Sequence, residues 1–225
     1  MYAQTAVKSH ILLRNGAYGI VMRGVQKCTR GCSSLRGRNK LPLCCIKLDT
    51  ATDPTCGSAG MLISCIQYLK DHDLEWRNVQ AYGQEINNLT SAIGRMNLFL
   101  HGVNDFHISN GDTLKNPSFI EHGKLKTFDI VLANPPYSIS QWDRGAFGTD
   151  KYGRNFLGTP SQGIADFAFL QHILKSMDPL NGRCAVLLPR GILSRYSEID
   201  MRKKLVELDL VDCIIGIGKG LFYNS

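Results

Sequence analysis

Four consecutive residues, Asn134-Pro135-Pro136-Tyr137, combine groups that can hold a planar amine. The two prolines fix two φ angles and remove two N–H donors, which makes a stiff corner. Asn134 is also kept extended because a proline follows it. An amide oxygen and a backbone carbonyl can together accept both hydrogens of an –NH2 group, while the Tyr137 ring stacks on its heterocycle. The alternative interpretation is a polyproline-like loop with a tyrosine in the core.

A second candidate is the run Asp-Pro-Thr-Cys-Gly-Ser-Ala-Gly at residues 53–60. Its small residues let a ligand approach the backbone closely, and the helix expected after it offers free N–H groups. The run lacks the Gly-x-x-x-x-Gly-Lys-Ser/Thr pattern, so it is not a phosphate-binding P-loop. On spacing alone, an ordinary tight strand–helix turn stays the alternative.

Two acidic residues follow other candidate strands. Glu85 comes after the apolar run at 79–82, where an acid suits a ribose diol in dinucleotide-binding folds. The alternative is an acid that favours the helix macrodipole. Asp112 lies in the turn Asn-Gly-Asp-Thr-Leu, where it can accept a hydrogen bond from an amino group or simply serve as a turn residue.

Alternating strand and helix patterns must position these turns. Helical spacing of apolar residues, with turn signals between the patterns, predicts an α/β fold with a mostly parallel sheet and helices on both faces. This Rossmann-like arrangement places ligands beyond the carboxyl ends of the strands, where the four turns lie. The expected strands are 79–82, 106–108, 130–133, 184–188 and 211–217, and the expected helices are 60–69, 86–100, 165–177 and 197–208.

The composition is that of an ordinary globular protein, with 225 residues, 44% of them hydrophobic and 20% charged. It argues against disorder, collagen and coiled coil as the dominant class. No stretch reaches the ~20 apolar residues of a membrane span. No basic cluster leads into an apolar run as in a signal peptide, so we expect a cytoplasmic chain without membrane contact.

The net charge of +7 comes from the first fifth of the chain. Residues 1–50 carry nine lysines and arginines against one acidic residue, whereas the rest carries 17 against 18. A basic arm that grips phosphates is one interpretation, and an atypical N-terminus is the other. We expect an irregular basic segment at 1–43 and one domain at 44–225, which the resemblance given below implies is a catalytic domain truncated at its C-terminus.

Eight cysteines raise the question of a metal site. Cys28, Cys32, Cys44 and Cys45 form the densest group. Adjacent cysteines rarely both bind one tetrahedral ion, so we expect no metal and unpaired thiols instead.

Taken together, the turns resemble S-adenosylmethionine-dependent amino-methyltransferases. More specifically, residues 49–225 resemble the modification (methylase) subunit of type I restriction–modification systems, the N6-adenine DNA methylase family. Two segments separate this family from methylases of protein glutamine or RNA guanine: the turn at 53–60 and the run Ala-Asp-Phe-Ala-Phe-Leu-Gln-His at 165–172. The other matching segments are 82–85, 96–98, 111–114, 128–137, 182–189 and 221–225.

The resemblance implies a role for each turn. The turn at 53–60 would bind S-adenosylmethionine with Asp53, Thr55, Gly57, Ser58, Ala59 and Gly60. Glu85 would bind the ribose, and Asp112 would lie near the cofactor adenine. Asn134, Pro135, Pro136 and Tyr137 would hold an adenine flipped out of duplex DNA, whose N6 attacks the methyl group. Cys56 would be a packing residue. The expected partners are double-stranded DNA and the specificity and restriction subunits of a type I complex.

Several departures from the family pattern leave alternatives open. The region 28–45 lacks the family's Thr-Pro loop, and Ala59 replaces a usual glycine. The segment Leu-Asp-Thr-Ala-Thr before Asp53 is only weakly apolar, so we expect a poorly formed first strand. The alternatives are an inactive truncated remnant, or a methylase of protein glutamine or RNA guanine.

Overall fold

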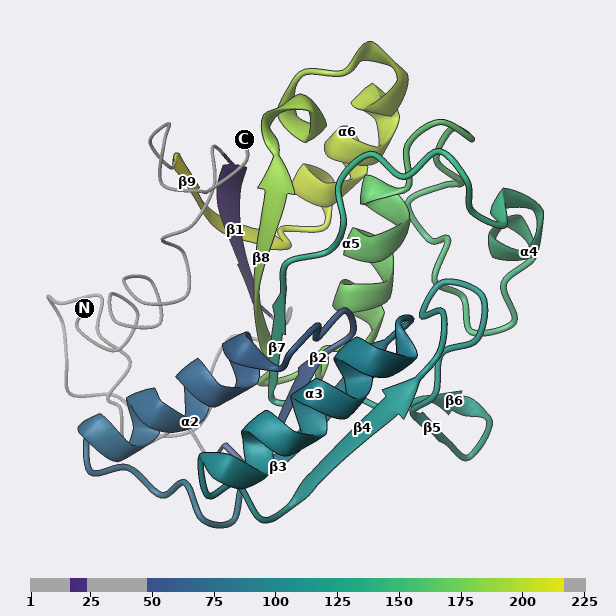
Figure 1. The fold of residues 1–225 in the computed structure, drawn as a ribbon. Coiled ribbons are helices and arrows are strands. Elements are labelled where there is room, and N and C mark those ends of the chain that lie inside the picture. The colour runs from purple at the N-terminus through teal and green to yellow at the C-terminus, as the bar shows by residue number, and fades with distance from the viewer. Residues whose placement is uncertain (1–16, 24–47, 217–225) are drawn as a thin grey trace, which may run out of the picture.

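The computed structural model describes residues 17–23 and 48–216, and Figure 1 shows their arrangement. Seven strands form one sheet in the order β4-β3-β2-β7-β8-β1-β9. The five strands from β4 to β8 in this order are parallel, while β1 is antiparallel to both β8 and β9. Their bounds are β1 Ala17–Arg23, β2 Thr50–Asp53, β3 Gln80–Glu85, β4 Phe106–Asn110, β7 Ile130–Ala133, β8 Arg183–Pro189 and β9 Val211–Gly216.

Helices cover both faces of this sheet, as predicted. The strand β7 shows this directly, because Leu132 packs in the core under α2 while Val131 and Ala133 pack in the core under α5. Figure 1 shows α2 and α3 together on one face and α5 on the other. The helices are α2 Gly60–Asp71, α3 Asn88–Leu100, α5 Asp166–Lys175 and α6 Ile199–Glu207, and α6 joins the α5 core.

The predicted elements are confirmed within a few residues at each end. For example, the helix predicted at 86–100 begins at Asn88, because the Asn87 side chain caps it by accepting from the Thr90 amide. Five short elements were not predicted. They are the hairpin β5 Ile120–Glu121 and β6 Lys124–Leu125, the helix α4 Arg144–Gly148, and the 3-10 turns η2 Arg190–Leu193 and η3 Tyr196–Glu198.

The expectation of a poorly formed first strand is wrong. Strand β2 is buried at the centre of the sheet and pairs with β3 and β7. The Asp129 carboxylate accepts hydrogen bonds from the Asp49 amide and from the amide and hydroxyl of Thr50. The Thr50 hydroxyl accepts in turn from the Asp129 amide. These long-range bonds supply the order that the weak apolar pattern does not predict.

The structure also differs from the prediction within the irregular segment at 1–43. Residues 17–23 form β1, which pairs along its whole length with β8. The sequence there, Ala-Tyr-Gly-Ile-Val-Met-Arg, contains β-branched and aromatic residues that suit a strand. Its glycine interrupts the apolar run and hides that signal.

Two other expectations concern membranes and metals. Across 17–23 and 48–216, no helix has both the length and the apolar character to span a bilayer. Cys28, Cys32, Cys44 and Cys45 lie outside the described residues. Cys56 and Cys65 are free and buried, and Cys184 is buried as well.

Candidate functional site

The sheet order brings the four candidate turns to one edge. Asp53 ends β2, Glu85 ends β3, and Asp112 follows β4, while Asn134 follows β7. These strands are consecutive neighbours in the order β4-β3-β2-β7, and all are parallel. Their carboxyl ends therefore meet at the same edge, as the alternating pattern predicts.

The turn after β2 is held by its own side chains. The Asp53 carboxylate accepts from the Thr55 amide at 2.9 Å and from the Thr55 hydroxyl at 3.3 Å. Gly57 has φ 53°, and a Cβ at Gly57 or Gly60 would meet nothing within 4 Å. The turn thus faces open space beside the start of α2, which is the arrangement a ligand needs.

Ala59 occupies a conformation that favours glycine. Its φ is 64°, and it is fully buried at the N-cap of α2. A left-handed conformation costs an alanine roughly 1–2 kcal/mol. The turn is therefore strained at Ala59, and the surrounding contacts hold it in place.

Glu85 joins the end of β3 to this turn. Its Oε2 accepts from the Gly57 amide at 3.0 Å, and its Oε1 accepts from the Asn87 amide at 2.8 Å. One carboxylate thus fixes both the Gly57 turn and the entry to α3. Both oxygens keep lone pairs that can accept further hydrogen bonds from a ligand hydroxyl.

Sequence reasoning missed two residues that support the turn. The Asn97 side chain in α3 donates to the Ser58 carbonyl at 3.0 Å. In the same helix, a Cβ at Gly94 would lie 3.0 Å from the Gly57 carbonyl oxygen. The helix therefore packs tightly against the turn through small and polar residues. Asn97 belongs to a matched family segment, which was the one available signal.

Two buried groups of the turn, the Asp53 carboxyl and the Cys56 thiol, have pKa values raised above those of exposed groups of the same kind. Burial raises the pKa of Asp53 from 3.8 to about 7, against its hydrogen bonds from Thr55, and the Glu85 charge adds to the rise. Burial, and then the charges of Asp53 and Glu85, raise the pKa of the Cys56 thiol well above its usual range. Cys56 is only 5% exposed, so its geometry favours a packing role over nucleophilic chemistry.

Asp112 has the geometry of a turn residue. Its Oδ1 accepts from the amides of Leu114 and Lys115 at 2.8 and 3.1 Å. The following Thr113 hydroxyl donates to the Pro54 carbonyl and so ties this turn to the one after β2. The half-buried Asp112 lies at the right edge, and its contact with a cofactor stays a prediction.

The corner after β7 presents Asn134 at the surface. Asn134 is exposed, Pro135 is buried and Tyr137 is half-buried. The Tyr137 hydroxyl donates to the Asn134 side-chain oxygen at 2.9 Å. Burial, followed by the negative charge of Asp166, raises the pKa of Tyr137 to about 12, so the hydroxyl keeps its proton. One lone pair of the Asn134 oxygen is thus engaged within the corner.

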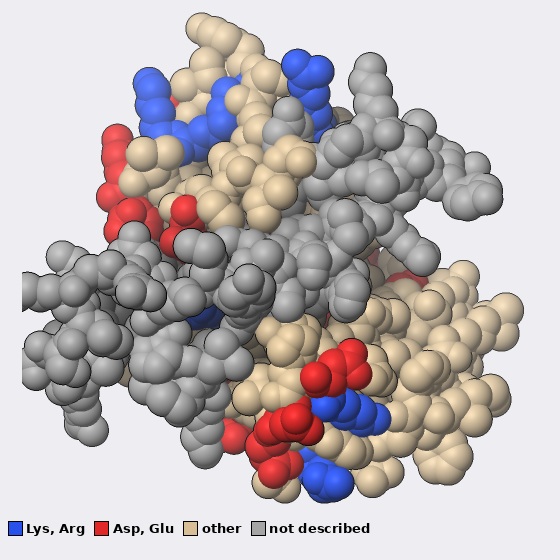
Figure 2. All heavy atoms as spheres, turned by 90° about the vertical axis from the view of Figure 1, so that its left-hand side faces the viewer, with Lys and Arg blue, Asp and Glu red and all other residues tan. Residues whose placement is uncertain are grey.

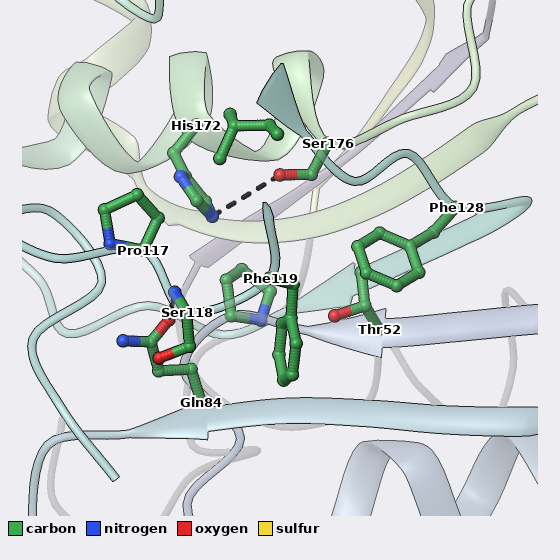
Figure 3. Close-up of a pocket in the computed structure, with 10 residues that line it drawn as sticks. Thr52, Gln84, Pro117, Ser118, Phe119, Phe128, His172 and Ser176 are labelled. Atoms are coloured by element: carbon green, nitrogen blue, oxygen red, sulfur yellow. Dashed lines mark hydrogen bonds between the residues drawn. The ribbon is translucent and has the colours of Figure 1, made fainter. Parts of the chain in front are cut away.

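A small cavity lies behind this edge, between β2, β3 and α5 (Figure 3). Its lining includes Thr52, Gln84, His172 and Ser176. The His172 Nε2 lies 3.4 Å from the Ser176 hydroxyl oxygen. Its volume of about 10 Å³ holds one water molecule. It is too small for a cofactor or a base.

A groove of about 710 Å³ lies at the opposite end of the strands. Thr127, which lines it, precedes β7, and Met177 and Pro179 precede β8. The groove is therefore distant from the four turns, and the candidate site is the open edge itself.

The fold and the edge define a class of protein, the methyltransferases with a Rossmann-like sheet. A Listeria monocytogenes structure assigned to the class I S-adenosylmethionine-dependent methyltransferases aligns with 70% of the chain and 44% of its own length. The TM-score is 0.55 at 19% identity, which supports the fold.

Residues 46–225 match the N-6 DNA Methylase family, and the chain belongs to it. It is 34% identical over 176 residues to the type I restriction enzyme HindI methylase subunit of Haemophilus influenzae, covering 77% of this chain and 38% of that protein. A crystal structure of a type I restriction–modification methyltransferase subunit from Streptococcus thermophilus aligns with a TM-score of 0.64 at 29% identity. It covers 77% of this chain and 41% of that one. The chain thus spans about two fifths of these relatives.

Proposed function

We propose that this chain is the catalytic part of a DNA adenine-N6 methyltransferase, the modification subunit of a type I restriction–modification system. The observation that carries the proposal is the adjacency of two turns on neighbouring parallel strands. The Gly57 turn follows β2, and the Asn134 corner follows β7. Family membership and the names of the relatives support the same function. The proposed partners are duplex DNA and the specificity and restriction subunits of such a complex, in the cytoplasm.

The residues of the Gly57 turn fit S-adenosylmethionine. The turn faces open space, and the carboxylates of Asp53 and Glu85 lie beside it. Negative charge suits a ligand that carries a sulfonium and an ammonium group. The Glu85 carboxylate has acceptor capacity for the ribose hydroxyls. When bound, this cofactor supplies an electrophilic methyl group.

The Asn134 corner fits the amine that receives the methyl group. The Asn134 oxygen and the Pro135 carbonyl would accept from the adenine amine and stabilise positive charge as it develops on N6. The Tyr137 ring would stack on the base. The Tyr137 hydroxyl would either keep its hydrogen bond to the Asn134 oxygen beside the incoming amine or give up that bond. The adenine must leave the duplex to reach this edge.

A calorimetric titration with S-adenosylmethionine tests the cofactor half. We expect weak binding by the whole chain, because Ala59 strains the turn. Glu85→Ala removes the acceptor of the Gly57 amide and should abolish binding. Asn134→Ala lies in the corner after another strand, β7, and should largely spare binding. If the chain is folded by circular dichroism and binds nothing, the interpretation as an inactive remnant is supported instead.

Transfer of a radiolabelled methyl group tests the reaction. The substrate is adenine-containing duplex DNA with a type I specificity subunit added. Label should appear as N6-methyladenine, and Asn134→Ala should abolish transfer while retaining cofactor binding. Label recovered on protein glutamine or RNA guanine, with none on DNA, would contradict the proposal.

A further inference from the structure

Two loops at the carboxyl edge converge on one buried carboxylate, Asp166. It is the first residue of α5 and is 1% exposed. Its Oδ1 accepts from the Ser138 amide at 2.7 Å, and its Oδ2 accepts from Arg195 at 2.6 Å. Ser138 directly follows Tyr137, and Arg195 follows η2 beyond β8. The contacts thus join the loop after β7 to the loop after β8.

The Ser138 backbone needs such a partner. Its φ is 52°, a left-handed conformation that is strained for a serine. A hydrogen bond from its amide to an ionised carboxylate is among the stronger kinds. The bond therefore offsets the strain and holds the chain in this turn immediately after the Asn-Pro-Pro-Tyr corner.

Arg195 holds the carboxylate in turn. Its guanidinium also approaches the Ser138 hydroxyl at 3.3 Å and the Glu198 carboxylate at 3.4 Å. Space for it depends on Gly191, because a Cβ there would lie 2.7 Å from the Arg195 Nε. A helix N-terminus by itself favours an acid, but the Asp166 oxygens bond to Ser138 and Arg195 rather than only facing α5.

The charge of Asp166 also reaches the corner. After burial, it is the second cause of the raised pKa of Tyr137. Asp166 therefore lies close enough to Tyr137 to act on it electrostatically. The Tyr137 hydroxyl, kept protonated, is the group that bonds to Asn134.

We propose that Asp166, held by Arg195, is a positioning residue that fixes the Asn134–Tyr137 corner through the Ser138 amide. This inference rests on the proposed function and adds to it the device that orients the amine-binding groups. The sheet edge positions the start of the corner through β7, and Asp166 positions its end. Rate then depends on both anchors, because the amide and carbonyl must face the amine together.

Hydrogen exchange of the Ser138 amide tests the anchor directly, without any need for activity. Asp166→Ala removes the acceptor, so we expect exchange at least tenfold faster, with the S-adenosylmethionine dissociation constant unchanged within twofold. Arg195→Lys keeps the positive charge but loses the two-pronged guanidinium group, so it should accelerate exchange less. This variant replaces Asp166→Ala in the test if Asp166→Ala does not fold. Unchanged exchange in a folded variant would refute the proposal.

A glycine rescue separates positioning from general loosening. A glycine at position 138 adopts the same φ without strain. The double variant Asp166→Ala/Ser138→Gly should therefore recover part of the protection from exchange at residue 138 and part of the methyl-transfer rate that Asp166→Ala loses. Ser140→Gly, two residues further along the same loop, is the matched control and should not rescue. Equal rescue by both glycines would overturn the proposal.

Steady-state kinetics then connect the anchor to the reaction. We expect Asp166→Ala to lower kcat for methyl transfer at least thirtyfold while KM for S-adenosylmethionine stays within twofold. If the wild-type chain transfers no methyl group with its specificity subunit present, the proposed function fails. The exchange and rescue measurements still decide whether Asp166 anchors the corner.

Discussion

Two carboxylates beside the same turn differ in burial and hence in chemistry. Asp53 is 2% exposed and has a pKa of about 7, whereas Glu85 is half-buried and bonds to two backbone amides. Near neutral pH, the Asp53 carboxyl group therefore changes between its protonated and its ionised form. A cationic ligand favours the ionised form of Asp53, so proton release and binding are linked.

The first prediction concerns cofactor affinity and pH. Because binding favours ionised Asp53, the affinity for S-adenosylmethionine should rise about tenfold between pH 6 and 8. Calorimetry in buffers of different ionisation enthalpy should register proton release near pH 7. Asp53→Asn keeps the acceptor for Thr55 and should flatten the pH dependence. Wild-type affinity that is constant over this range would contradict the role given to Asp53.

At the scale of elements, α3 packs in an unexpected orientation. Its apolar residues fall at helical spacing, and the helix forms as predicted. Yet Met96 and Phe99 are 64% and 71% exposed, whereas Ser91 and Leu98 are fully buried. The buried face is the one that carries Gly94, because only a small residue fits against the Gly57 turn. The close contact between Gly94 and the Gly57 turn, rather than burial of the largest apolar side chains, determines which face of α3 packs against the protein.

The second prediction tests that contact. Gly94→Ala gains roughly 1 kcal/mol of helix propensity, but its Cβ lies 3.0 Å from the Gly57 carbonyl oxygen. We expect the thermal midpoint to change little while the affinity for S-adenosylmethionine falls about tenfold, equivalent to ~1.4 kcal/mol. Met96→Ala, on the exposed face of α3, is the control and should leave affinity unchanged. Equal affinities for both variants would show that the turn tolerates the added methyl group.

The elements that sequence predicts well are those with local signals. Strand β7 is found at its predicted bounds, because its apolar run ends at a proline pair. Strand β2 carries no such signal, since its order depends on Asp129, 79 residues away from Thr50. The turns at Gly57 and Asn134 were predicted from their residue types. Asn97, Asp166 and Arg195 were given no role, because their contacts exist only once distant loops meet.

At the scale of the whole molecule, two buried groups give opposite dependences of stability on pH. The folded pKa of Asp53 is raised to about 7, so its contribution falls as pH rises from about 4 to 7. Burial, and then the charge of Arg154, lower the pKa of His172 to about 3. The contribution of His172 is therefore present above pH 6.5 and is lost as pH falls toward 3.

The third prediction separates the two groups by their slopes. Between pH 4 and 6.5 the opposing contributions offset each other in the wild-type chain. Asp53→Asn should make the free energy of unfolding increase with pH over this interval, and His172→Gln should make it decrease. Urea unfolding at several pH values measures both slopes. Parallel slopes for the two variants would show that other groups control the acid response.

The distribution of charge over the molecule bears on the proposed binding of duplex DNA. Beyond residue 50, acids and bases nearly balance. Figure 2 shows small groups of both signs on one face of the molecule, beside wide areas of the described residues that carry no charge. Affinity for duplex DNA rests largely on cationic contacts with phosphate. We therefore expect the nine lysines and arginines within residues 1–50 to supply most of the non-specific affinity for the proposed DNA partner.

The fourth prediction compares two charge changes of equal size. Replacing Arg30, Arg36, Arg38 and Lys40 with glutamine should weaken duplex DNA binding at least tenfold at low salt. The slope of log affinity against log salt should fall by about 3.6, because each of the four lost phosphate contacts removes ~0.9. The control replaces four exposed lysines of the described fold, Lys124, Lys151, Lys175 and Lys203, with glutamine. Since both variants lose four charges, a similar loss in both would assign the affinity to net charge, whereas a larger loss in the first locates the phosphate contacts in the N-terminal segment.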